Sequence, residues 1–191
     1  MASLMIVCGP QAVGKMTVAE KIKEKTDFTL TTNHDSIELS DKIFEKGSQA
    51  QRELRNLIRE ATFKTAIDNN VNIIFTYVWA FDEKSDWDYV LGLKEQFEKS
   101  GGKFYLVELE TDLQTRLERN TTPHRLESKP SKKDIEWSKN DILKTNEKYR
   151  LNSNEGEITF ENFVKIDNTN LSPEEVANIV VDKFELKLTN C

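Results

Sequence analysis

Continuously apolar runs and amphipathic segments follow one another along the chain. The first run, 4-LMIVC-8, ends at Gly9 and is typical of a strand buried on both faces, because a strand with one exposed face alternates apolar and polar residues. Later apolar or β-branched runs predict four more strands, at 28–32, 71–79, 103–109 and 163–167.

The segments between these strands predict helices. Apolar residues four positions apart, such as Val18 and Ile22, indicate a helix with one buried face. Thr111 and Gln114 predict a capping box, and Pro173 lies at a permitted first helical position. Helices are expected over 17–25, 37–46, 49–68, 86–99 and 111–120, with two more starting at 131–134 and after 172.

This alternation predicts an α/β fold in which helices cover both faces of a parallel sheet. Five parallel strands in a three-layer α/β/α arrangement are expected, as one domain over residues 1–191. The longest apolar runs are too short to span a bilayer, and no basic segment precedes the first strand. We therefore expect a cytoplasmic protein with no membrane partner.

The stretch 9-GPQAVGKMT-17 carries the candidate chemistry. It joins the first strand to the first helix with the spacing G-x-x-x-x-G-K, in which backbone N–H groups and a helix N-terminus surround phosphate oxygens. Gly14 permits close approach of the backbone, and Lys15 is expected to reach the β- and γ-phosphates. The predicted phosphate-binding residues are Gly9, Gln11, Ala12, Val13, Gly14, Lys15, Met16 and Thr17.

The loop and its context resemble the P-loop small-molecule and nucleotide kinases, the group of adenylate, shikimate and gluconate kinases. The whole chain also resembles a bacterial group of shikimate-kinase-like proteins. The resemblance implies the P-loop NTPase fold, ATP and Mg²⁺ as cofactors, and an arginine-bearing lid. The chain departs from the common pattern at Met16, because the hydroxyl group comes one residue later, at Thr17.

That departure bears on how magnesium is held. A thioether is a poor ligand for hard Mg²⁺, so Thr17, water and the nucleotide phosphates are the expected ligands. The third strand contains no acidic residue, and Asp82, which follows it, is the candidate for a role through water.

Arginines follow the fourth strand in 116-RLERNTTPHR-125. In the kinases named above, arginines of the corresponding helix and lid surround the transferring phosphoryl group, whose charge they stabilise. Arg116 is predicted to contact the nucleotide, and Arg119 and Arg125 are the preferred catalytic pair; a solvated helix face is the alternative for Arg116 and Arg119. The lid is expected over 120–137, with His124 on its surface.

The acceptor is expected to bind beside the helices of 33–70, because ligands of such sheets lie outside the carboxyl ends of the strands. Asp35 is a candidate for the base that takes the acceptor proton, and His34 is the other candidate. Asp35 could instead cap the following helix, and His34 could make a structural hydrogen bond.

Further side chains could line the acceptor pocket. Tyr77, Trp79 and Phe81 alternate, so they either complete the core or face the acceptor. Arg52, Arg55 and Arg59 share a helix face, which indicates either a solvated surface or a grip on a phosphorylated acceptor.

The formal net charge of −6 argues against a nucleic-acid polymer as partner. The sequence favours an ATP-dependent phosphotransferase that acts on a small hydroxyl compound or a nucleotide, as a monomer or homodimer. The alternative is an ATP-binding module or slow ATPase without kinase turnover. A GTPase switch fits less well, because the guanine-binding N-K-x-D tetrapeptide is missing, although GTP in place of ATP stays open.

Overall fold

A five-stranded parallel sheet forms the centre of the protein, which is described here from a computed structural model covering residues 1–122 and 134–189. The strand order is β2-β3-β1-β4-β5, so β1 lies in the middle between β3 and β4. The strands are β1 (Leu4–Cys8), β2 (Thr29–Thr32), β3 (Ile73–Tyr77), β4 (Phe104–Glu110) and β5 (Phe163–Asp167). The predicted α/β class and the five parallel strands are confirmed.

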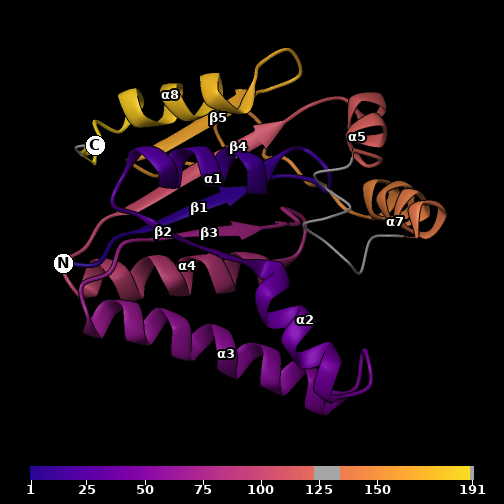
Figure 1. The fold of residues 1–191 in the computed structure, drawn as a ribbon, viewed down its shortest axis with the longest axis horizontal. Helices are drawn as coiled ribbons and strands as arrows, with labels where there is room; N and C mark the ends of the chain where they lie inside the picture. The colour runs from indigo at the N-terminus through magenta and orange to yellow at the C-terminus, as the bar shows by residue number, and fades with distance from the viewer. Residues whose placement is uncertain (123–133, 190–191) are drawn as a thin grey trace.

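Helices cover both faces of this sheet, as Figure 1 shows. α1 and α8 pack on one face, and α3 and α4 cover the other. The helices are α1 (Lys15–Lys25), α2 (Asn33–Ile43), α3 (Gln49–Asp68), α4 (Lys84–Lys99), α5 (Leu113–Arg119), α7 (Ile135–Lys148) and α8 (Pro173–Lys183).

The residues of β1 explain why its sequence is apolar without interruption. Leu4, Ile6 and Cys8 point into the core beneath α3 and α4, where Phe63 and Phe97 pack. The alternate residues of the strand point to the opposite face and contact the apolar sides of α1 and α8. Because both faces are covered, β1 has no position that favours a polar side chain.

Several helix starts differ from the predictions: α1 and α4 begin two residues early, at Lys15 and Lys84, and the starts of α2 and α5 differ because of their caps. α2 begins at Asn33 rather than Ile37, because Thr32 caps it at once: the Thr32 hydroxyl accepts from Asp35 N, and Asp35 Oδ2 accepts from Thr32 N. The predicted capping box of Thr111 and Gln114 is wrong. Asp112 is the N-cap of α5, and its Oδ1 accepts from Thr115 N at 2.8 Å.

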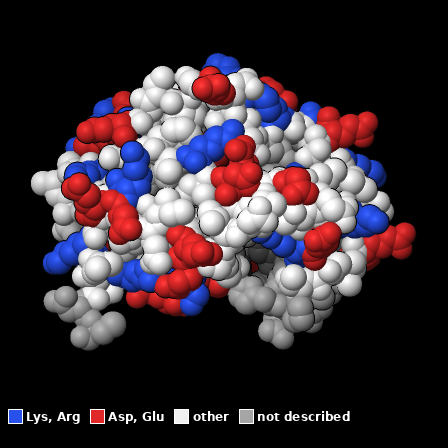
Figure 2. Space-filling view, turned by 90° about the horizontal axis from the view of Figure 1, so that it is seen from above, with Lys and Arg blue, Asp and Glu red and all other residues white. Residues whose placement is uncertain are grey.

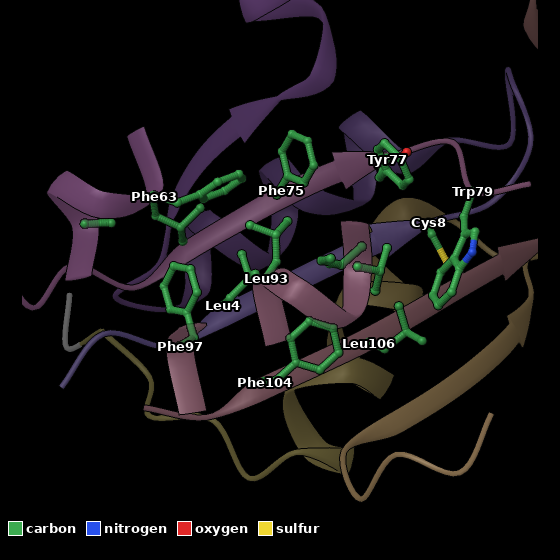
Figure 3. Packing of buried hydrophobic residues seen from close by; sticks show 14 of the residues in the cluster. Leu4, Cys8, Phe63, Phe75, Tyr77, Trp79, Leu93, Phe97, Phe104 and Leu106 are labelled. Carbon is green, nitrogen blue, oxygen red and sulfur yellow. The ribbon is translucent and has the colours of Figure 1, made fainter. Parts of the chain in front are cut away.

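The aromatic residues after β3 belong to the core. Tyr77, Trp79 and Phe81 are all at most 9% exposed, and the rings of Trp79 and Phe81 stack with centroids 4.4 Å apart. In Figure 3, Trp79 lies beside Cys8 at the carboxyl end of the sheet. Core packing, one of the two alternatives that the sequence left open, therefore accounts for these side chains.

The described surface has no large region of one charge on the face that Figure 2 shows, where acidic and basic side chains are interspersed. Within the described residues, no helix combines the length and apolarity needed to cross a lipid bilayer.

Candidate functional site

The loop between β1 and α1 has the backbone shape that close contact with an anion needs. Gly9 has a φ of 134°, and a Cβ at this position would lie 2.3 Å from the main-chain oxygen of Leu109. Gly9 therefore cannot be replaced without moving β1 away from the end of β4. Ala12 and Gly14 also have positive φ, at 62° and 108°. Where residues with positive φ are next to residues with negative φ, successive N–H groups turn toward one concave side of the loop.

α1 begins at Lys15, directly after Gly14 as its N-cap. Lys15, Met16 and Thr17 therefore form the first turn, where main-chain N–H groups lack helical partners and the helix dipole is positive. The Lys15 Nζ donates to the main-chain oxygens of Gly9 and Pro10, each at 2.7 Å. The predicted phosphate-binding residues thus form one continuous loop and helix start.

Arg116 lies against this loop although it is far away in the sequence. Its Nε donates to Gln11 O at 2.9 Å, and its Nη1 donates to Asn146 Oδ1 of α7 at 2.7 Å. The side chain is 3% exposed, and Nη2 is buried with no hydrogen-bond partner in the described part of the chain. Burial lowers the pKa of Arg116 to about 10.

Arg119 joins the phosphate loop to the segment after β5. Its Nη1 donates to Val13 O at 3.0 Å, and its Nη2 donates to Asn168 O at 2.8 Å. The buried Asn168 also donates from Nδ2 to Val13 O at 2.8 Å. In this conformation the Arg119 guanidinium is occupied by neutral protein oxygens. Its predicted partner Arg125, like His124 and most of the lid 120–137, lies outside the described residues.

The two candidate bases lie in the first turn of α2. Asp35 is exposed, but one of its carboxylate oxygens is engaged in the capping box with Thr32. Asp35 is therefore not the N-cap that the sequence left open as an alternative; Thr32 is the N-cap, and Asp35 is the third residue of α2 and completes the capping box. His34 is half-buried beside it. Both residues follow β2, at the carboxyl edge of the sheet, where an acceptor was expected.

The proposed metal ligands lie on two different segments. Thr17 is half-buried in the first turn of α1, whereas the exposed Asp82 accepts at Oδ1 from Arg150 N at 3.0 Å. Nearby, Asp86 accepts from the Tyr77 hydroxyl at 2.9 Å, which together with burial raises the pKa of Tyr77. Across 1–122 and 134–189, no three His, Cys, Asp or Glu side chains cluster as metal ligands would. The donor set fits Mg²⁺ only if water and the nucleotide supply most of the oxygens.

A cavity of about 160 Å³ opens between α2, α3 and the neighbouring strands. Its polar wall includes Thr31, Asp35 and Arg59, and its apolar wall includes Phe63 and Phe75. The cavity lies at the carboxyl end of β2, so it is the described hollow that fits the expected position of an acceptor.

Arg59 differs from its neighbours on α3. Its Nε donates to Ser36 Oγ at 2.9 Å and its Nη2 donates to Asn33 Oδ1, while Arg52 is exposed and its guanidinium group donates to Gly47 O. Burial and the nearby Arg55 lower the pKa of Arg59. The three arginines therefore do not form one solvated face.

Three side chains of the site were not predicted from the sequence. Asn33, Asn146 and Asn168 each hold an arginine, and they lie in α2, α7 and the segment after β5. A single asparagine carries no motif, so only the folded chain brings these partners together.

The comparisons with known proteins give the fold. No protein-family model and no curated protein matches the sequence. Among solved structures, a sugar kinase from Janibacter sp. HTCC2649 is 14% identical, with 97% of this chain and 94% of that chain covered and a TM-score of 0.57. The tunicamycin resistance protein of Deinococcus radiodurans is 16% identical over 100% of both chains, with a TM-score of 0.58.

An APS kinase from Mycobacterium tuberculosis, solved in complex with AMPPNP and APS, is 16% identical, with 96% of this chain and 98% of that chain covered and a TM-score of 0.57. At these identities the likeness concerns the fold and does not extend to the substrate. The chain shares its fold with these solved structures, a three-layer α/β/α arrangement around a five-stranded parallel sheet.

Proposed function

We propose that this protein is an ATP-dependent phosphotransferase that moves the γ-phosphoryl group of ATP to a small acceptor. The observation that carries the proposal is the position of Arg116, whose desolvated guanidinium group rests on the phosphate loop at Gln11 O. A buried cation next to a ring of main-chain N–H groups is costly without an anion, and a nucleotide phosphate would supply one.

The nucleotide would bind the loop through Gly9, Gln11, Ala12, Val13, Gly14, Met16 and Thr17, with Lys15 leaving its two carbonyl partners for the phosphates. Arg116 would bind the same phosphates, and Arg119 and Arg125 would stabilise the charge of the transition state. For Arg119 this requires release of at least part of its contacts with Val13 and Asn168. Such rearrangement on ligand binding is common among phosphoryl-transfer enzymes with lids.

Mg²⁺ would be held by Thr17 and, through water, by Asp82, and would neutralise charge on the phosphates. The Met16 thioether would pack beside this position without coordinating the ion.

The acceptor would bind in the cavity beside Asp35 and Arg59. Asp35 or His34 would receive the proton of the accepting hydroxyl group. The half-buried Arg59 favours an acceptor that carries an anionic group, such as a phosphate or a carboxylate, because in the described chain it is held only by neutral partners. The solved relatives include kinases of sugars and of APS, so small acceptors suit this fold.

Binding of Mg·ATP by isothermal titration calorimetry is the first test. Lys15→Ala should weaken binding by at least about tenfold, because it removes a charge-assisted contact with the phosphates. Lys23→Ala, on the exposed side of the same helix, is the matched control and should bind as the wild type does. GTP in the same experiment tests the choice of nucleotide.

A second candidate function is an ATP-binding module or slow ATPase without kinase turnover. Met16 favours it, together with the lack of an acidic ligand cluster within the described residues. Transfer of labelled γ-phosphate to a panel of sugars, nucleotides and hydroxy acids would separate the two functions. Tight Mg·ATP binding with no transfer to any member of a broad panel would favour the module.

A further inference from the structure

Three arginines at the carboxyl edge of the sheet share one kind of partner. Each donates a hydrogen bond to the side-chain oxygen of an asparagine from another element of the fold. The pairs are Arg59 with Asn33, Arg116 with Asn146, and Arg119 with Asn168.

None of these three arginines forms a salt bridge with a carboxylate of the described chain, although the protein has 33 acidic residues. Arg150 is different. It lies in the segment after α7 and donates to both carboxylate oxygens of Glu157, at 2.6 and 2.7 Å. Arg150, which connects two segments of the chain, thus has a bidentate carboxylate partner. The three arginines at the candidate site have neutral partners instead.

The difference has a direct electrostatic consequence. Asparagine and aspartate have nearly the same shape and can accept the same hydrogen bond from a guanidinium group. A carboxylate would also stabilise the charged arginine and compete with an incoming anion for it. An amide oxygen fixes the direction of the arginine without cancelling its charge.

We propose that Asn146 is a positioning residue that orients Arg116 toward the phosphate loop and, being neutral, leaves the guanidinium charge available for an anionic phosphate ligand. This inference rests on the proposed function, because it concerns the same nucleotide site. Asn33 and Asn168 hold Arg59 and Arg119 in the same manner.

The docking of α7 on α5 places Asn146 where this role requires. Ser138, Ile142 and Asn146 are four residues apart and lie on one face of α7. Ser138 Oγ donates to Asn120 Oδ1 at 2.9 Å, and Asn146 accepts from Arg116 eight residues further along. Ser138 and Ile142 are buried, whereas Asn146 is exposed. Substitution of Asn146 should therefore not disturb the packing of α7.

Asn146→Asp is the decisive variant, because a structural role and the proposed role predict different results. The new carboxylate can accept the same hydrogen bond and add an ion pair, so the melting temperature of the ligand-free protein should stay the same or rise. Affinity for Mg·ATP should fall by about tenfold or more, because the new carboxylate neutralises the Arg116 charge that would otherwise attract the phosphates. Asn146→Ala leaves the charge of Arg116 uncompensated and removes only the hydrogen bond that orients its guanidinium group. This variant should therefore weaken Mg·ATP binding less than Asn146→Asp does.

A double-mutant cycle separates this effect from simple repulsion between a new carboxylate and the phosphates. In an Arg116→Gln background, Asn146→Asp should have little further effect on Mg·ATP binding, because the charge that it cancels is already gone. Asn72→Asp is the matched control. Asn72 Oδ1 accepts from Ser3 N at the opposite edge of the sheet, and the change should leave binding unaltered.

The outcomes distinguish the inference from the proposed function. If the wild type binds neither Mg·ATP nor inorganic pyrophosphate, the proposed function is wrong and the inference falls with it. If the wild type binds and Arg116→Gln weakens binding while Asn146→Asp does not, only the inference is overturned. A drop in melting temperature with Asn146→Asp, or an undiminished effect in the Arg116→Gln background, would also overturn it.

Discussion

The Nε of Arg116 donates a 2.9 Å hydrogen bond to the main-chain oxygen of Gln11, so an arginine from the helix after β4 rests on the loop after β1. β1 and β4 are adjacent parallel strands, and their carboxyl ends meet at one edge. Arg116 brings a desolvated positive charge to a loop whose own N–H groups already favour an anion. This contact connects the fold to the proposed chemistry.

The buried charge of Arg116 predicts how stability depends on alkaline pH. Burial lowers the pKa of Arg116 in the folded protein to about 10, well below the ordinary value of an arginine. Between these values the unfolded chain binds the additional proton, so the contribution of Arg116 to stability should rise as pH rises through about 10. The gain cannot exceed about 1.4 kcal/mol per pH unit for one proton.

Urea unfolding of the wild type and Arg116→Gln between about pH 8 and about pH 11 would measure this effect. Other lysines and tyrosines titrate equally in both proteins and cancel in the difference between their free energies of unfolding. That difference should shift in favour of the wild type as pH increases. A flat or opposite trend would mean that the Arg116 charge is not desolvated in the ligand-free protein.

Met16→Ser places a hydroxyl group where the common phosphate-loop pattern has one. If Thr17, water and the nucleotide already satisfy Mg²⁺, turnover at saturating Mg²⁺ should change by less than about threefold, and the Mg²⁺ concentration for half-maximal rate should fall modestly. Initial rates against Mg²⁺ concentration provide the measurement. A gain of about tenfold or more would show that Met16 limits catalysis.

Asp35→Ala separates helix capping from catalysis. Loss of the capping box should lower the free energy of unfolding by about 1 kcal/mol, whatever the function of the residue. Glu175→Ala is the matched control, because Ser172 and Glu175 form the same capping box at the start of α8. If Asp35 is also the acceptor base, Asp35→Ala should lower kcat by about a hundredfold or more while Glu175→Ala leaves it unchanged. Equal kcat values in the two variants would assign Asp35 to capping alone.

Arg59→Gln tests the nature of the acceptor. An anionic acceptor should lose its contact with the half-buried guanidinium group of Arg59, so its KM should rise by about tenfold or more while the KM for ATP stays the same. Arg52→Gln, on an exposed position of α3, should alter neither value. A neutral acceptor whose KM is unaffected by Arg59→Gln would exclude the anionic class.

Much of the fold was predictable because it depends on local patterns. The apolar run 4–8 correctly indicated a strand that is buried on both faces of the sheet. The predicted bounds of 49–68 and 163–167 coincide with those of α3 and β5. The start of α2 was predicted four residues late, since Thr32 can be either the last residue of a strand or a cap. Local sequence does not decide between two such roles for one threonine.

The candidate site was predictable only in part, for a related reason. The residues of 9–17 are contiguous, so their spacing is visible in the sequence, and its glycines have the positive φ values that the loop needs. Whether Arg116 or Arg119 contacts that loop through a backbone oxygen depends on how α5 leaves β4, which no spacing reveals.

Local sequence patterns were enough to predict the parallel sheet, the glycine-rich loop of 9–17 and the charged side chains near it, because each follows from neighbours along the chain. The burial of Arg116 against Gln11 and the pairing of arginines with asparagines depend instead on how the folded chain packs. These relationships join segments up to 105 positions apart. They arise when helices pack on the sheet and remove water from particular polar groups, which then take whichever partner the packing brings within reach.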